Sequence, residues 1–214
     1  MIKAIFFDLD GVIVDSETYD QQITADFMRE NNYKTDPSVF RVWIGGSPEI
    51  DSWSIILPQV HPDDDPATFR DKVNEYHRVR RERIYFPPLA FPDSVGAIRH
   101  FHELGYKMAC CSASEPWYIE RALEQLEIRD CFNFVVSGRD LTHGKPDPQI
   151  YLLTREHLGL RKDEAVIIED STYGIKAGKN AGILTIARKD HKFGMDQSEA
   201  DGFIDTLYEI EKYL

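Results

Sequence analysis

The chain has 214 residues, which is enough for one medium-sized domain or for a core domain with a small insertion. Its 42% hydrophobic and 12% aromatic content is ordinary for a globular protein, so a buried core is expected and extensive disorder is excluded. The formal net charge of −12 argues against a broad nucleic-acid surface, because phosphate backbones are bound by clustered lysines and arginines.

The first part of the chain predicts one strand followed by helical and turn-rich sequence. The apolar run at 2–7 is rich in residues that favour β-structure and predicts a buried strand. From 18 to 32, apolar residues recur at the spacing of one helical face. Polar, turn-rich sequence then leads to an acidic turn at 62–66, and a second long helix is expected at 67–84. The basic concentration at 78–83 is interpreted as a solvated face of that helix.

Beyond Pro92, predicted helices and strands alternate. The helices are expected at 95–104, 119–126, 149–158 and 172–181, and the strands at 106–111, 134–137, 165–168 and 183–187. Such alternation implies right-handed crossovers and a parallel sheet that is covered on both faces. We therefore predict an α/β fold: a Rossmann-like, doubly wound core domain formed by 1–15 and 90–214, with an inserted α-helical cap domain at 16–89.

Acidic side chains follow the first and fourth predicted core strands. In open α/β sheets, ligands bind at the carboxyl ends of the strands. Asp8 and Asp10 come directly after the first strand, and Gly11 lets the chain turn away so that both carboxylates can face one crevice. Glu169 and Asp170 follow the fourth strand. Carboxylates gathered at one edge repel one another, and a divalent cation such as Mg²⁺, which prefers oxygen ligands, resolves that conflict.

Hydroxyl and ammonium groups follow the second and third predicted core strands. The hydroxyl and amide groups of 112–114 could hold an oxyanion, and Lys145 is fixed between a glycine and a proline. Ser171 is placed to cap the helix that follows the fourth strand. Together these residues predict a site that binds a phosphate group beside a metal ion.

These motifs resemble those of the haloacid dehalogenase-like superfamily, within its phosphatase and β-phosphoglucomutase-like group with a helical cap. The resemblance covers essentially the whole chain, and the stretch 174–182 also matches, with small residues that let a helix pack close to the sheet. The motifs are Phe7-Asp8-Leu9-Asp10-Gly11-Val12, Cys111-Ser112-Ala113-Ser114, Lys145-Pro146-Asp147-Pro148 and Ile168-Glu169-Asp170-Ser171.

The resemblance implies a phosphatase that acts on small phosphorylated metabolites. Asp8 would be the nucleophile that forms an aspartyl-phosphate. Asp10 would protonate the leaving oxygen and then activate the incoming water. Ser112, the amide of Ala113 and Lys145 would hold and neutralise the phosphoryl oxygens.

The resemblance also implies a Mg²⁺ site. The ligands would be Asp8, the backbone carbonyl of Asp10 and Asp170, with Glu169 in the inner or outer coordination shell. The metal would let an anionic carboxylate approach an anionic phosphate. By analogy with the family, we expect the substrate to be a small sugar phosphate or polyol phosphate.

β-Phosphoglucomutase is the main alternative, because Asp15, Glu17 and Tyr19 follow the first motif much as they do in that enzyme. Two departures favour the phosphatase. Asp20 stands where the mutase has a histidine, and Glu49 stands where it has an arginine that binds the distal phosphate. Replacing a cation by an anion should weaken binding of a bisphosphate at its far end.

The choice of a phosphatase also depends on residues elsewhere in the chain. Arg41, Arg78 or Arg80 could bind a distal phosphate in place of the missing arginine.

Haloacid dehalogenases proper do not use magnesium, so Asp10 and the acids of the fourth motif argue against them. Transport ATPases of the superfamily need membrane helices. A phosphometabolite-binding module without turnover stays open as a non-enzymatic function.

The inserted segment carries the expected specificity residues. Gly45 and Gly46 lie where such caps approach the active site, although a plain turn between helices explains them equally well. Trp43 and Trp53 are expected in the cap's own core rather than in a sugar pocket. The segment 192–198 could rim the pocket, and the sequence assigns it no mechanism.

The remaining features bear on compartment and assembly. No apolar stretch approaches the ~20 residues of a membrane helix, and Asp8 interrupts the first apolar run too early for a signal peptide. Cys110 and Cys111 are expected to be buried on opposite faces of a strand. Together with Cys131 they do not form the pattern of a disulfide framework. We expect a cytoplasmic monomer that binds neither nucleic acid nor a membrane.

Overall fold

The computed structural model describes residues 1–34, 36–43, 52–60 and 65–214. The chain divides into two compact units, a core unit (Met1–Asp15 with Phe86–Leu214) and a helical unit (Ser16–Tyr85). The sequence placed the return to the core at residue 90, a few residues after this break. Phe86 belongs to the core unit because its side chain is fully buried and its amide donates to Gln125.

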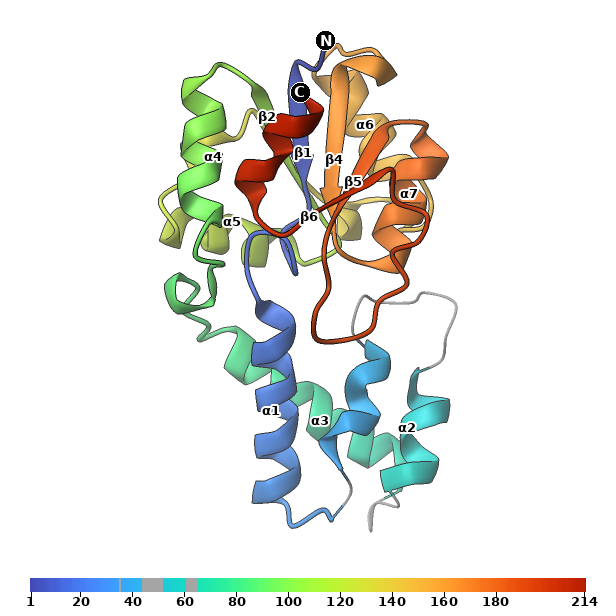
Figure 1. The fold of residues 1–214 in the computed structure, drawn as a ribbon. Coiled ribbons are helices and arrows are strands. Elements are labelled where there is room, and N and C mark those ends of the chain that lie inside the picture. The colour runs from blue at the N-terminus through green and yellow to red at the C-terminus, as the bar shows by residue number, and fades with distance from the viewer. Residues whose placement is uncertain (35, 44–51, 61–64) are drawn as a thin grey trace. The chain divides into compact units, whose positions relative to one another are not determined.

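A parallel sheet of six strands forms the centre of the core unit in the part of the chain that is described (Figure 1). The strand order is β3-β2-β1-β4-β5-β6, and every neighbouring pair is parallel. The strands are β1 (Ala4–Phe7), β2 (Lys107–Ser112), β3 (Phe134–Ser137), β4 (Ala165–Glu169), β5 (Leu184–Arg188) and β6 (Gly202–Ile204). The predicted doubly wound α/β fold is confirmed.

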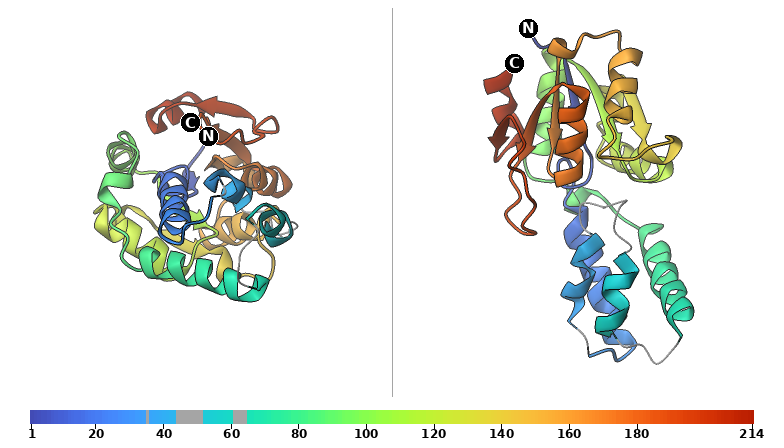
Figure 2. Two further views of the ribbon diagram at one scale, coloured as in Figure 1. Left: turned by 90° about the horizontal axis from the view of Figure 1, so that it is seen from below. Right: turned by 90° about the vertical axis from the view of Figure 1, so that its right-hand side faces the viewer.

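Helices cover both faces of this sheet (Figures 1 and 2). They are α4 (Ser94–Glu103), α5 (Pro116–Gln125), α6 (Gln149–His157) and α7 (Thr172–Ala181). Helices α6 and α7 bury Ile150, Tyr151 and Ala177 against β1, β2 and β4. The side chain of Ser171 accepts a hydrogen bond from the amide of Gly174, so Ser171 caps α7 as predicted.

The strand order reverses between β1 and β4, which is where an open α/β sheet forms a crevice at its carboxyl edge. Phe7 of β1 is in register with Ile168 of β4, and the amide of Asp8 donates to the carbonyl of Ile168 at 3.0 Å. The next residues along the two strands, Asp8 and Glu169, therefore emerge side by side at this edge.

The helical unit has its own apolar core. Its helices are α1 (Ser16–Glu30), α2 (Ser52–Val60) and α3 (Pro66–Arg81), with a 3₁₀ helix at Pro37–Trp43. Trp53 packs edge-to-face on Phe40 and Phe69 in this core, as predicted. Gly45, Gly46 and Glu49, to which the sequence assigned a role in substrate recognition, lie outside the described residues, as does the side chain of Trp43.

Several elements of the described chain were not predicted from the sequence, among them helix α2, strand β6 and the 3₁₀ helices. Helix α2 contains Pro58, a residue typical of a helix boundary, within a segment that is otherwise rich in turn-forming residues. Strand β6 has only three residues, too few for a periodic pattern, and a 3₁₀ helix at Leu207–Tyr213 follows it. None of the helices in the described ranges is both long and apolar enough to cross a bilayer.

Gly178 provides a test of how closely α7 packs on the sheet. A Cβ at this position would lie 2.3 Å from Thr185 Oγ1 and 3.2 Å from Ile167 Cδ1. We expect Gly178→Val to lower the free energy of unfolding by about 2 kcal/mol, because an overpacked core must shift. Urea unfolding followed by circular dichroism measures this change. Gly144→Ala is the control, since a Cβ there meets nothing within 4 Å; equal stability of the two variants would contradict the close packing.

Candidate active site

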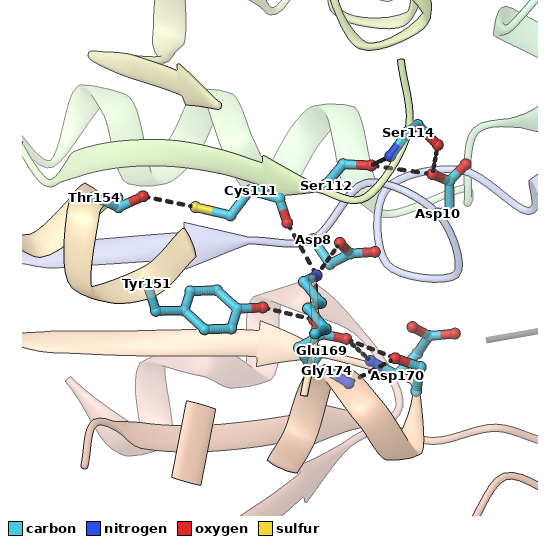
Figure 3. A network of polar contacts seen from close by, with 12 residues as sticks. Asp8, Asp10, Cys111, Ser112, Ser114, Tyr151, Thr154, Glu169, Asp170 and Gly174 are labelled. Carbon is cyan, nitrogen blue, oxygen red and sulfur yellow. Dashed lines mark hydrogen bonds and ion pairs between the residues drawn. The ribbon is translucent and has the colours of Figure 1, made fainter. Parts of the chain in front are cut away.

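The ammonium group of Lys145 lies between the carboxylates of Asp8 and Glu169, which follow β1 and β4. Figure 3 labels both acids. The Lys145 Nζ atom donates to Asp8 Oδ1 and to Glu169 Oε1, both at 2.6 Å, and to the carbonyl of Cys111 at 3.1 Å. The side chains of Lys145 and Asp8 are each 9% exposed and that of Glu169 is fully buried. Burial lowers the pKa of Lys145, but the two carboxylates outweigh it and raise that pKa well above its usual value, so the group stays charged.

Glu169 is held by hydrogen bonds to both of its carboxylate oxygens. Oε1 also accepts from the hydroxyl of Tyr151 at 2.5 Å, and Oε2 accepts from the amide of Asp170 at 3.1 Å and from Ser171 Oγ at 3.3 Å. A Cβ on Gly174 would lie 2.0 Å from the Glu169 carboxyl carbon. The glycine in the first turn of α7 therefore makes room for this buried carboxylate.

Oxygens of Asp8, Glu169 and Asp170 lie within 4.8 Å of one another, close enough to share a cation. Burial, the largest effect, raises the pKa of Asp8 well above its usual value, and Lys145 opposes that rise. Gly11 gives the Asp170 carboxylate room, because a Cβ there would lie 1.9 Å from Asp170 Oδ2. Gly11 also adopts φ 78°, which a side chain disfavours. This set of closely gathered carboxylate oxygens fits Mg²⁺, which prefers oxygen ligands.

Asp10 is oriented by the loop that follows β2. Its Oδ2 atom accepts from Ser114 Oγ at 2.7 Å and from Ser112 Oγ at 3.2 Å (Figure 3). Ser112 Oγ in turn accepts from the amide of Ser114 at 3.0 Å, and Ser137 Oγ donates to the carbonyl of Ser114 at 2.6 Å. The hydroxyl of Ser112, to which the sequence assigned a phosphate oxygen, is thus directed at Asp10 in this structure.

The structure gathers the residues of all four motifs at one sheet edge. Asp8, Lys145, Glu169 and Asp170 form one cluster, and Asp10 with Ser112 forms a second hydrogen-bonded group. Ala113 lies between the two serines and close to Gly138. A Cβ added at Gly138 would lie 3.3 Å from the Ala113 Cα.

Sequence reasoning did not anticipate two side-chain contacts in this group. Ser114 was included in the predicted oxyanion-binding stretch 112–114, but its hydrogen bond to Asp10 was not predicted. The Ser-x-Ser pattern after β2 is a signal for it, because alternate residues at a strand end share one side. Tyr151 carried no usable signal, since an aromatic residue on the buried face of a helix is most simply a core residue.

Comparison with known proteins defines the family. A sequence model described as haloacid dehalogenase-like hydrolase matches residues 5–188, most of the chain. The chain belongs to the haloacid dehalogenase-like hydrolase family. The resemblance drawn from the four motifs is confirmed by this match.

The relatives of this hydrolase include two phosphatases whose names state a phosphorylated carbohydrate as the substrate. The phosphorylated carbohydrates phosphatase of Thermotoga maritima is 27% identical over 214 residues, covering 94% of this chain and 88% of the relative. The fructose-1-phosphate phosphatase of Escherichia coli is 28% identical over 184 residues, covering 84% of this chain and 92% of the relative.

Solved structures show the same fold. β-Phosphoglucomutase from Clostridium difficile superposes with a TM-score of 0.72 at 22% identity, covering 98% of this chain and 93% of the other. CbbY from Rhodobacter sphaeroides, solved in complex with phosphate, gives a TM-score of 0.74 at 20% identity over 98% and 96% of the two chains.

Lys145→Met tests how the buried charges are balanced. Without the ammonium group, the pKa of Asp8 in the folded state should rise further above its value in the unfolded chain. The folded state then binds more protons, so stability is retained at low pH and lost as the pH rises. We expect a loss of about 1 kcal/mol near pH ~5 and about 3 kcal/mol near pH ~8, measured by urea unfolding in the presence of a chelator.

Lys3→Met is the matched control for this prediction. Lys3 pairs with Glu164 at 2.6 Å, but its side chain is 60% exposed, so the loss should stay below about 1 kcal/mol. The charge-balance interpretation fails if both variants show the same dependence of stability on pH.

Proposed function

We propose that this protein is a Mg²⁺-dependent phosphatase that hydrolyses small sugar or polyol phosphates through an aspartyl-phosphate on Asp8. The observation that carries the proposal is the buried Asp8 carboxylate, held by Lys145 beside the acids Glu169 and Asp170. The substrate class is supported by the names of the two phosphatase relatives, which act on phosphorylated carbohydrates and on fructose 1-phosphate.

Asp8 supplies the nucleophile in this proposal. Lys145 fixes one carboxylate oxygen, Oδ1, and the other, Oδ2, is the atom that we assign to attack. The new bond joins Oδ2 to phosphorus while the bond from phosphorus to the ester oxygen breaks. The charge on Lys145 lies close enough to this carboxylate to offset the negative charge of the incoming phosphoryl group.

Asp10 transfers the proton in both steps. In the first step its carboxyl group gives a proton to the departing ester oxygen. In the second step it takes a proton from the water that attacks phosphorus, and the Asp8–phosphorus bond breaks to release phosphate. The hydrogen bonds from Ser114 and Ser112 hold this carboxyl group in one orientation, which both proton transfers need.

Residues of the cluster suit a Mg²⁺ site, with Asp8, Asp170 and the backbone carbonyl of Asp10 as ligands. We assign Glu169 to the outer shell, because Lys145, Tyr151 and the Asp170 amide already donate to its two oxygens. When bound, the ion would supply positive charge that reduces the repulsion between Asp8 and the phosphate.

Contacts within the helical unit support hydrolysis over the mutase alternative. Arg78 pairs with two glutamates of its own helical segment, and Arg80 pairs with Glu30. Asp20, at the position where the mutase has a histidine, forms an ion pair with Arg81. The charges of these arginines are therefore compensated by acids of the helical unit itself, which disfavours a role in holding a second phosphate.

Asp8→Asn tests the nucleophile. We expect phosphate release to fall by at least about 1,000-fold, because the amide is a poor nucleophile while the side chain keeps its shape. Steady-state phosphate release on the best substrate measures this change. Asp163→Asn, a surface acid that pairs with Arg161, should retain full activity. Wild-type turnover by Asp8→Asn in a clean preparation would rule out the aspartyl-phosphate route.

A substrate panel tests the reaction itself. We expect free phosphate from several sugar or polyol phosphates, only when Mg²⁺ is present. The panel includes β-glucose 1-phosphate with a trace of the 1,6-bisphosphate and coupled detection of glucose 6-phosphate. Glucose 6-phosphate without phosphate release would identify a mutase, and no turnover of any compound, including a generic aryl phosphate, would favour a binding module.

A further inference from the structure

The segment at 190–198 leaves the carboxyl end of β5 and extends beyond the edge of the sheet before the chain returns to β6 (Figure 1). One side chain gives it a defined conformation. The carboxylate of Asp190 accepts from the amides of Lys192, Phe193 and Met195 at 2.8, 2.9 and 2.7 Å. The backbone of the segment therefore folds around a single acid, although the segment contains no helix or strand.

Gln197 joins this segment to the acid-bearing turn after β4. Its Nε2 atom donates to the carbonyl of Asp170 at 2.6 Å and to the carbonyl of Arg188 at 2.8 Å. Its Oε1 atom accepts from the amide of Asp190 at 3.1 Å. Both ends of the Gln197 amide are thus engaged, and the half-buried side chain bridges the ends of β4 and β5.

A second hydrogen bond fastens the same two segments. Thr172 Oγ1, at the start of α7, donates to the carbonyl of Asp196 at 2.8 Å. The 190–198 segment is therefore attached on both sides of Ser171, once through Asp170 and once through Thr172.

Asp170 is in consequence fixed at both of its peptide groups. Its amide donates to Glu169 Oε2 at 3.1 Å, and its carbonyl accepts from Gln197. The Asp170 carboxylate occupies the space left by the missing side chain of Gly11, so a small displacement of its backbone would change its distance from Asp8. The backbone carbonyl of this ligand is therefore bound by a residue 27 positions further along the chain.

We propose that Gln197 is a positioning residue for Asp170, and that it acts on Mg²⁺ affinity by fixing the backbone of this ligand. The inference rests on the proposed function of the site. It assigns the 190–198 segment a role that the four motifs do not explain. Removing a residue that holds a metal ligand typically weakens metal affinity about 10–100-fold.

Gln197→Leu removes the donors and the acceptor while keeping the size of the side chain. We expect the dissociation constant for Mg²⁺, measured by calorimetry without substrate, to rise about 10-fold. The Mg²⁺ concentration that gives half-maximal phosphate release should rise by a similar factor, whereas kcat at saturating Mg²⁺ should stay within about 3-fold of wild type. An unchanged melting temperature without Mg²⁺ would separate this effect from a loss of folding.

Two further variants complete the experiment. Ser198→Ala changes the neighbouring residue of the same segment and should bind Mg²⁺ like wild type. Asp170→Asn should bind Mg²⁺ far more weakly than Gln197→Leu. If Gln197→Leu does not fold, Gln197→Asn, whose side chain is too short to reach all three partners, takes its place.

The outcomes separate this inference from the proposed function. Wild-type Mg²⁺ affinity in the Gln197 variant, together with a loss of affinity in Asp170→Asn, would overturn the role of Gln197 and leave the metal site intact. Absence of Mg²⁺ binding by the wild-type protein would overturn the metal-dependent function and the inference with it.

Discussion

The two ion pairs of Lys145, with Asp8 and with Glu169, are the interaction on which the rest of the site depends. Two carboxylates, Asp8 and Glu169, are buried within reach of each other, and a shared ammonium group at 2.6 Å from both makes that arrangement tolerable. Asp8 and Lys145 are 137 residues apart in the sequence, and Lys145 and Glu169 are 24 apart. Only the parallel sheet, which places the ends of β1 and β4 side by side, brings them together.

The surrounding residues are explained by the space and hydrogen bonds that these charges require. Gly174 is helical and has no unusual backbone angle; it is needed because the Glu169 carboxylate occupies the position of its missing side chain. The hydroxyl of Tyr151, on α6, donates a hydrogen bond to the same carboxylate. A buried carboxylate with donors on several sides keeps one orientation, and this orientation in turn fixes where Lys145 and Asp8 lie.

The sequence was sufficient for the fold class and for the gathering of the motifs, because both follow from periodicity. Alternating strands and helices specify a parallel sheet, and the residue after each strand must then reach the same edge. The bonds within the site follow no such period. Tyr151 to Glu169 and Gln197 to Asp170 are set by side-chain conformation and by the path of a loop, so neither spacing nor residue type predicts them.

The failure to predict helix α2 and strand β6 has a similar cause. Helix α2 contains Pro58, which favours a helix boundary in the sequence, and β6 is a three-residue strand that is recognised only by its pairing with β5. Each is defined by tertiary packing rather than by a local pattern, and tertiary context overrides weak local preference.

The choice between hydrolysis and transfer is decided by what holds the far end of a substrate. In the function that we propose, the core residues bind groups that all phosphate monoesters share, so they do not distinguish water from a sugar hydroxyl as the second acceptor. A mutase must also bind a second phosphate, for which a cation has to be available. Recruiting Arg81 would break its two hydrogen bonds to Asp20 and leave that carboxylate without its partner beside an incoming anion. In the function that we propose, the likeness to β-phosphoglucomutase in fold therefore does not extend to transfer chemistry, and water is the acceptor that demands nothing further of these residues.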